Sequence, residues 1–315
     1  MARKKFDIQG LIVGQILDAL NNEIERAEND PNYKPSLPWV KPWKGGYSGM
    51  PKSLSTKKPY RGFNVLYLSF VANEKGYNSP YWLTFNQAGK LGGKIKATER
   101  KNSSIVTLWK PFEVKDDEGN VTYRKWMLRY FRVYNLDQAE GIDENKLPQD
   151  ATAEGVNPLE SFSPIEACEK IINEMPNKPK YIIGKIQRAC YSPTTDTINM
   201  PEPLSFVGEA EYYSTFFHEL GHSTGHKKRL NRKTLTKMAA FGSDDYGEDE
   251  MVAEMTAAIL CGITGTVSTV MENTLAYLMN WRKSISADMG IVLRASTNAT
   301  KSADCILGKL KMSTK

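Results

Sequence analysis

Histidine placement is the feature that most restricts how this chain can fold. The chain has 315 residues and three histidines, and all three fall in the nine-residue segment HELGHSTGH, at His218, His222 and His226. The residues around this segment have helical periodicity. A mainly apolar stripe at that spacing is formed by Tyr213, Phe217, Leu220 and Thr224. The segment therefore predicts an amphipathic helix that packs this stripe against a core.

Two of the histidines are spaced to share a metal. On a helix His218 and His222 lie one turn apart on one face, so both imidazoles can bind a tetrahedral Zn²⁺ at ~2.0–2.1 Å. Glu219 lies beside that face, where a carboxylate can take a proton from metal-bound water. The alternative is a chance HExxH sequence, but with histidine this rare we expect one in well below ~1% of chains. The native metal stays open, because imidazole and carboxylate ligands also accept Mn²⁺, Co²⁺ and Ni²⁺.

His226 is less suited to be a ligand. The segment approaches the longer metzincin motif, but that motif has its last histidine where Lys228 stands. On a continuous helix His226 would lie ~12 Å along the axis from His218, too far for one metal. If the helix ends at Gly225, His226 becomes a cap or a group on the substrate side of the site. The ligand alternative for His226 stays open.

Two glutamates further along the chain are candidates for the third protein ligand that a catalytic zinc needs. In EDEMVAEMTAAIL, Glu250 and Glu254 are four residues apart on a helix that is otherwise apolar on that side. Unpaired carboxylates on such a face are costly, and a metal and a ligand histidine would give them partners. Asp249, by contrast, suits a solvated helix start.

The segment EMVAEMTAA resembles the ExxxD ligand helix of gluzincin-type peptidases. The resemblance implies that Glu250 is the third ligand and that Glu254 is the hydrogen-bond partner of a ligand histidine. The reverse assignment stays open.

Charge is divided unevenly along the chain. Residues 1–140 hold 23 Lys and Arg against 14 Asp and Glu, a net of +9, whereas residues 141–315 hold 19 against 22, a net of −3. Five of the six tryptophans also lie in the first part. The asymmetry predicts two domains with different functions. We expect a basic domain at 1–140, a polar linker at 141–163 and a second domain at 164–315.

Hydrophobic periodicity predicts an α+β fold. In the first domain we expect helices at 6–28 and 61–75, a strand at 79–85 leading into a short helix near 87–89, and strands at 105–114 and 121–134. The second domain is expected to be mostly helical, with helices at 164–175, 208–225, 248–264, 269–288 and 300–310. A hairpin at 190–200, which includes Tyr191, either holds an extended substrate by strand addition or is purely structural. Tyr191 and His226 are also candidates for stabilising an oxyanion on the substrate side of the site.

Aromatic and basic residues alternate in PWVKPWKGG, KKPYRGFN, YWLTF and LWKPF. Proteins that bind single-stranded nucleic acid combine Lys or Arg for the phosphates with aromatic faces on which bases stack. The alternative is that each Trp belongs to the core and the lysines form a solvated face. With a net charge of +9, the domain predicts single-stranded DNA binding. The candidate residues are Trp39, Trp43, Lys44, Tyr60, Arg61, Asn64, Trp82, Lys110 and Arg132.

Location is predicted from what the sequence lacks. No run reaches the ~18 apolar residues of a membrane span, and no signal peptide is recognisable. The four cysteines are scattered, which suits reduced thiols. We therefore expect a cytoplasmic protein with no membrane partner.

Both halves resemble the ArdC-type antirestriction proteins of conjugative plasmids and other mobile elements. The N-terminal matches are PWVKPW, PYRGFNVLYL, SPYWLTFNQAGKLGG and VYNLDQAEGI, and the C-terminal matches are YSPTTDTINMP, YYSTFFHELGHSTGHKKRLNR, EDEMVAEMTAAIL and YLMNWRKSISAD. The resemblance implies a single-stranded-DNA-binding domain joined to a zincin-like metallopeptidase domain. It also implies a role in protecting incoming DNA from host restriction. One departure is SSIVTLW after ATERKN, where family members usually have a glycine-containing turn.

We therefore predict a zinc metallopeptidase that binds single-stranded DNA and acts on an unidentified protein substrate. The alternative is a non-catalytic DNA-binding antirestriction protein with a structural or idle metal site. A secreted effector protease is disfavoured by the basic domain. A nuclease is disfavoured because HExxH with a lone zinc suits amide hydrolysis better than two-metal phosphodiester chemistry.

Overall fold

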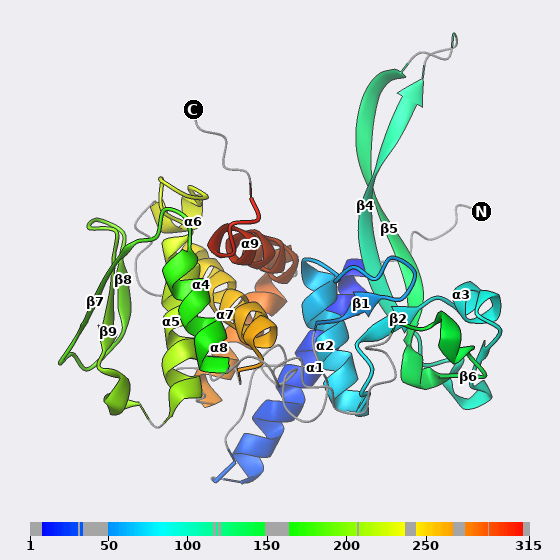
Figure 1. Cartoon of the computed structure of the whole chain (residues 1–315), viewed down its shortest axis with the longest axis horizontal. Coiled ribbons are helices and arrows are strands. Elements are labelled where there is room, and N and C mark those ends of the chain that lie inside the picture. Colours follow the sequence, from blue (N-terminus) through cyan, green and yellow to red (C-terminus); the bar gives the residue numbers. More distant parts are fainter. Residues whose placement is uncertain are drawn as a thin grey trace.

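The structure is a computed structural model that describes residues 8–30, 32–33, 50–115, 118, 121–148, 164–206, 208–236, 244–266, 275–288 and 290–310. Helices and strands are mixed, and the predicted α+β class is confirmed (Figure 1). Among the described helices, none combines the length and apolar character needed to cross a membrane.

The N-terminal half packs two helices, α1 (Ile8–Asn29) and α2 (Phe63–Lys75), beside a four-stranded sheet. The sheet order is β1 (Lys52–Ser53), β2 (Tyr81–Leu83), β5 (Val121–Asn135) and β4 (Ser104–Lys115). β2 leads into α3 (Phe85–Lys90), which begins with a capping box in which Thr84 and Gln87 bond reciprocally. The strands β3 (Lys94–Ile95) and β6 (Ala139–Glu140) form a separate antiparallel pair.

β4 and β5 form a long antiparallel ribbon that projects away from the rest of the protein (Figure 1). At its base Ile105, Val106 and Val133 are buried in the core, whereas the part beyond them rises clear of the sheet. Both strands were expected from their β-branched and aromatic content.

The C-terminal half is mostly helical, as predicted. Its helices are α4 (Pro164–Glu174), α5 (Glu209–Ser223), α6 (Lys233–Thr236), α7 (Asp244–Thr264), α8 (Leu275–Ala287) and α9 (Gly290–Ile306). A three-stranded sheet lies beside α5, with β9 (Thr197–Pro201) between β7 (Lys180–Gly184) and β8 (Cys190–Ser192). The antiparallel β8–β9 hairpin was expected, but the parallel strand β7 was not.

The largest hydrophobic cluster runs through both halves. It joins Val13 and Leu20 of α1 to residues such as Trp281 of α8 and Val292 of α9. α1 packs against α8 and α2 packs against α9. Arg61 also forms an ion pair with Asp304 of α9. The halves that the sequence separates by charge therefore share one core.

The segment expected to be a linker begins later than its predicted start at residue 141. Ile142 and Leu147 pack against a second cluster in the N-terminal half. The Asp143 amide donates a hydrogen bond to the Leu91 carbonyl at 3.1 Å. Residues 141–148 thus belong to the N-terminal fold, because their apolar side chains pack against this second cluster. Residues 149–163 lie outside the described part of the chain.

Candidate metal centre

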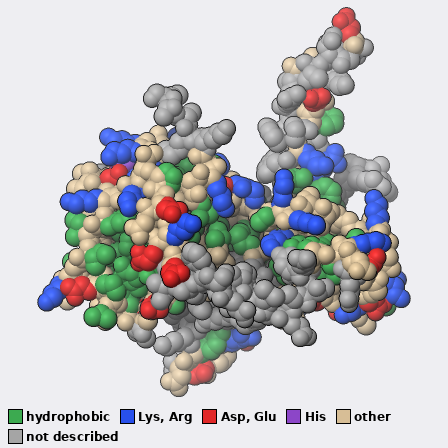
Figure 2. Space-filling view, in the orientation of Figure 1, with side chains coloured by type: hydrophobic (Ala, Val, Ile, Leu, Met, Phe, Trp, Pro, Cys, Tyr) green, Lys and Arg blue, Asp and Glu red, His purple; other side chains and the backbone are tan. Residues whose placement is uncertain are grey.

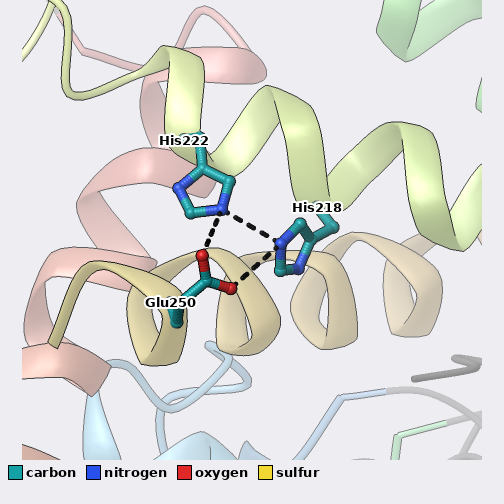
Figure 3. A group of neighbouring side chains, drawn as sticks. All are labelled: His218, His222 and Glu250. Atoms are coloured by element: carbon teal, nitrogen blue, oxygen red, sulfur yellow. Dashed lines mark hydrogen bonds and ion pairs between the residues drawn. The ribbon is translucent and has the colours of Figure 1, made fainter. Parts of the chain in front are cut away.

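The site is built where α5 crosses α7. Gly221 of α5 lies against Ala253 of α7 so closely that a Cβ on Gly221 would lie 2.8 Å from the Ala253 Cα. Real Cβ atoms essentially never approach that near, so this crossing requires glycine. Because the two helices meet here, Glu250 of α7 points at the two imidazoles of α5 (Figure 3).

Three side chains converge on one point. The Nε2 atoms of His218 and His222 lie 3.0 Å apart. Glu250 Oε2 lies 3.5 Å from His218 Nε2, and Glu250 Oε1 lies 3.4 Å from His222 Nε2. Ligand atoms bound at 2.0–2.1 Å to a tetrahedral ion are separated by about 3.3 Å. This triangle of ligand atoms, two imidazole nitrogens and a Glu250 oxygen that lie within 4.8 Å of one another, can hold a divalent metal.

Each histidine is also backed by a carboxylate on α7. The Nδ1 of His222 lies 2.8 Å from Asp249 Oδ2, within hydrogen-bond distance. The Nδ1 of His218 lies 3.5 Å from Glu254 Oε1, a contact outside hydrogen-bond geometry in this structure. A carboxylate behind Nδ1 fixes the ring so that Nε2 faces the metal position. Glu254 thus lies behind His218, and its role as the hydrogen-bond partner of a ligand histidine stays a prediction.

Arg232 anchors the carboxylate behind His222. Its guanidinium donates from Nε to Asp249 Oδ1 at 3.0 Å, and it also donates to the Gly221 carbonyl at 3.0 Å. Both the Arg232 and Asp249 side chains are almost fully buried, at 6% and 5% exposed. Arg232 therefore ties the start of α7 to the end of α5, on the side of His222 away from the metal position.

The charges of the site favour ionised carboxylates. Burial alone would raise the pKa of Asp249, but the hydrogen bond from His222 and the charge of Arg232 outweigh it and lower the pKa to about 2. Burial is also opposed at Glu250, where attraction to His222 and hydrogen bonding to His218 hold the pKa well below its usual range. Glu250 is thus in its metal-binding form at neutral pH.

Glu219 lies next to the three converging side chains, two of which are partly exposed. Glu219 follows His218 directly on α5 and is buried. The Glu250 and His222 side chains keep 20% and 13% of their surface exposed. The site is therefore partly exposed at Glu250 and His222.

Tyr191 and His226 belong to a neighbouring network, not to the triangle of ligand atoms. The Tyr191 hydroxyl donates to Asp196 Oδ1 at 2.9 Å, and Asp196 also pairs with the buried Arg229. The Nδ1 of His226 lies 3.6 Å from Asp196 Oδ2 and accepts a hydrogen bond from the Lys228 amide. Arg229 also donates from Nε to the Ser223 carbonyl at 2.7 Å, so this network ties the end of α5 to the β8–β9 turn. His226 lies beside this network, in the turn that follows α5.

Two of the predicted DNA-binding residues are structural. Trp82 is fully buried and meets Tyr77 edge to face, so its ring cannot stack on a base. The prediction for Trp82 was wrong because the strand that carries it lies inside the sheet. The Asn64 side chain bonds both the carbonyl and the amide of Thr107, which fastens α2 to β4.

The other candidates differ in accessibility. Tyr60 is half-buried against the core. Arg61 forms an ion pair with Asp304, although its side chain stays 65% exposed. Lys110 and Arg132 are exposed on the β4–β5 ribbon. Trp39, Trp43 and Lys44 lie outside the described residues.

The fold and the metal centre define the class: an α+β domain followed by a zincin-like domain with an HELGH helix. Residues 166–298 match the family described as zincin-like metallopeptidase, and residues 14–139 match the N-terminal domain of anti-restriction factor ArdC. Crystal structures of the antirestriction ArdC protein from the R388 plasmid are similar over the whole chain. The metal-free form has 29% identity and a TM-score of 0.73, covering 96% of this chain and 97% of that one. The chain belongs to the ArdC-type proteins.

A Mn(II)-bound form of R388 ArdC matches with 28% identity and a TM-score of 0.71, covering 98% of this chain and 100% of that one. Together with the ligand triangle, it indicates a divalent metal. DNA primase TraC of Escherichia coli is 30% identical over 291 residues, which are 86% of this chain but 25% of TraC. The uncharacterized protein y4eC of Sinorhizobium fredii (strain NBRC 101917 / NGR234) is 27% identical over 95% of this chain and 91% of its own length. The match to TraC covers only about a quarter of the length of that primase.

Proposed function

We propose that this protein is a zinc-dependent peptidase that binds single-stranded DNA and protects the incoming DNA of a mobile element from host restriction. The observation that carries the peptidase proposal is the convergence of two imidazole nitrogens and one carboxylate, 3.0 to 3.5 Å apart, beside Glu219. His218, His222 and Glu250 would hold the metal. The Mn(II)-bound form of R388 ArdC supports a divalent ion, and Mn²⁺, Co²⁺ or Ni²⁺ could replace Zn²⁺.

The proposed chemistry divides roles between the metal and the chain. A divalent metal at this position supplies a Lewis acid for the scissile carbonyl and lowers the pKa of water. Glu219 accepts the proton of the attacking water and then delivers it to the leaving amine. Asp249 and Glu254 keep the imidazole rings oriented.

The proposed peptide-binding element is β8. Within the described strands it pairs with β9 alone, and it packs against α5, which carries both histidines. An extended substrate can add to such an edge through backbone hydrogen bonds. The Tyr191 hydroxyl is engaged by Asp196, so we assign Tyr191 to supporting this hairpin rather than to the reaction.

The DNA-binding proposal relies on the N-terminal half. Its net charge of +9 suits a polyanion, and its match to the ArdC N-terminal domain supports DNA as the partner. Joined to the metal centre through a shared core, this half would bring the peptidase to DNA-bound protein substrates.

Metal content and a plasmid-protection assay test the proposal together. We expect about one zinc per chain in the wild type and in Glu219→Gln, and none in His218→Ala, by elemental mass spectrometry. We also expect Glu219→Gln to lose protection of transferred DNA in a restricting host. If this variant loads metal and still protects fully, the site is structural or idle and the protein acts by binding DNA alone. If the wild type holds no metal after reconstitution, the peptidase proposal fails.

A further inference from the structure

The β4–β5 ribbon exposes large apolar side chains far from the metal centre. Beyond its buried base, Leu108 is 48% exposed, Phe112 51% and Phe131 40%. Figure 2 shows Lys and Arg side chains gathered around the base of the ribbon. Several large apolar side chains exposed on one element point to an interaction site in a folded protein.

The register places these groups on one face. Leu108 pairs with Arg129, Val106 with Phe131 and Lys110 with Met127. Directly opposite residues of an antiparallel pair share a face, and so do alternate residues along one strand. Among the side chains that the structure describes, one face therefore carries five exposed residues, which we call the ribbon face: Leu108, Lys110, Phe112, Arg129 and Phe131.

The ribbon face combines apolar platforms with cations. The Lys110 ammonium lies 5.7 Å from the centre of the Phe131 ring, and Arg129 stands directly opposite Leu108. Phe131 and Phe112 are six residues apart in register, which spans about 20 Å. A strand stacked at about 3.4 Å per nucleotide would place about six bases along that length. Single-strand binders use sites of about 4–16 nucleotides.

We propose that the protein binds single-stranded DNA on the ribbon face. Bases stack on Phe112 and Phe131 and against Leu108, while Lys110 and Arg129 pair with phosphates. The inference rests on the proposed DNA-binding function and locates it on the ribbon.

Charge decides between DNA and other occupants. β4 and β5 together contain six Lys and Arg and a single Glu, and 7 of their 27 residues are aromatic. A polyanion matches this charge, and every base offers a face to an aromatic ring. A single strand fits better than a duplex, because paired bases are already stacked on one another. A protein partner would have to be strongly acidic to match the same face.

The opposite face of the ribbon supplies a matched control. Tyr130 is 42% exposed on β5 and pairs with Thr107, so its side chain lies on that other face. Tyr130→Ala therefore removes one exposed aromatic ring from the same strand without touching the ribbon face. All variants are made in the full chain.

The test measures fluorescence anisotropy of a labelled 20-nucleotide oligothymidylate and of a duplex of the same length. We expect Phe112→Ala with Phe131→Ala to weaken oligothymidylate binding at least about tenfold, and Tyr130→Ala to change it by less than about twofold. Lys110→Gln with Arg129→Gln should reduce the slope of log affinity against log salt by about 1.4, since each lost phosphate contact on a single strand contributes about 0.7. Unchanged thermal unfolding and metal content would show that each variant folds.

The outcomes separate this inference from the proposed function. If the wild type binds oligothymidylate tightly and the ribbon-face variants bind equally well, the DNA lies elsewhere and only this inference is overturned. If the wild type binds neither probe, the DNA-binding function itself fails. Tighter binding to the duplex, lost in the same variants, would keep the ribbon but overturn the choice of a single strand.

Discussion

Arg232 and Asp249 form a buried ion pair directly behind His222, with Arg232 Nε 3.0 Å from Asp249 Oδ1. The other Asp249 oxygen meets His222 Nδ1 at 2.8 Å. The orientation of the His222 ring, a proposed metal ligand, thus depends on an arginine 10 residues further along the chain, outside the HELGH segment.

Replacing Arg232 tests this dependence. Arg232→Met removes one partner of a buried pair and leaves the Asp249 charge poorly compensated, so we expect a loss of about 3–5 kcal/mol in unfolding free energy. We also expect metal affinity to fall about 10–100-fold, as when the groups that orient a ligand histidine are removed. Chemical denaturation and chelator competition measure the two effects. Thr234→Val is the control, because Thr234 also bonds Asp249 Oδ1 at 3.0 Å but is uncharged. An equal loss of metal affinity in both variants would contradict a special role for Arg232.

Replacing Gly221, the glycine within HELGH, tests the close contact between α5 and α7. Gly221→Ala would drive a methyl group into the α7 backbone at Ala253, and we expect the helices to separate at a cost of about 1–3 kcal/mol. Because Glu250 is carried by α7, metal affinity should fall as well. Gly247→Ala is the matched control, since a Cβ there meets nothing within 4 Å. It should be neutral or stabilising by up to about 1 kcal/mol. Denaturant midpoints and metal titration of both variants decide the matter.

Asp196 gives a pH-dependent prediction. Burial opposes its ionisation, but hydrogen bonds from Arg229 and Tyr191 outweigh this and lower its pKa below 3.8. A carboxyl with a lowered folded-state pKa contributes stability above its unfolded pKa of about 3.9, and this contribution disappears as the pH falls through the folded value. Asp196→Asn should therefore destabilise the protein more at pH 6 than at pH 3.

The backbone does not complicate the Asp196 comparison. Asp196 has a φ of 51°, a conformation that asparagine tolerates as well as aspartate. Urea denaturation at both pH values, with chelator present throughout, isolates the carboxylate from the metal. A destabilisation of the same size at pH 3 and pH 6 would mean that the charge of Asp196 contributes nothing.

Local spacing made the centre of the site predictable. His218 and His222 face one point because four residues make about one helical turn. The same spacing singled out Glu250 and Glu254, and the resemblance to gluzincin-type peptidases favoured Glu250 as the third ligand. Asp249 was misjudged as a solvated helix start, yet it is buried on His222. Arg232 and the α5–α7 contact at Gly221 were missed altogether. Both depend on how two helices cross, which no periodicity within one helix encodes.

The same limit applies to the fold. Long amphipathic helices and the aromatic strands β4 and β5 were predicted, because their patterns are repeated over many residues. The start of α9 was placed ten residues too late, since GIVLRASTNA is rich in residues of low helix propensity and only burial of Ile291, Val292 and Ala295 makes it helical. Trp82 was taken for an exposed platform because composition cannot tell a surface tryptophan from a core one.

The core shared by α1 and α8 has a consequence for inheritance. A gene fragment that encoded only the N-terminal half would leave the apolar side of α1 without its covering helix, and a fragment that encoded only the other half would strip α8 and α9 in the same way. We expect such pieces to be prone to aggregation. Recombination is therefore expected to move both halves together, and the match to TraC covers 86% of this chain.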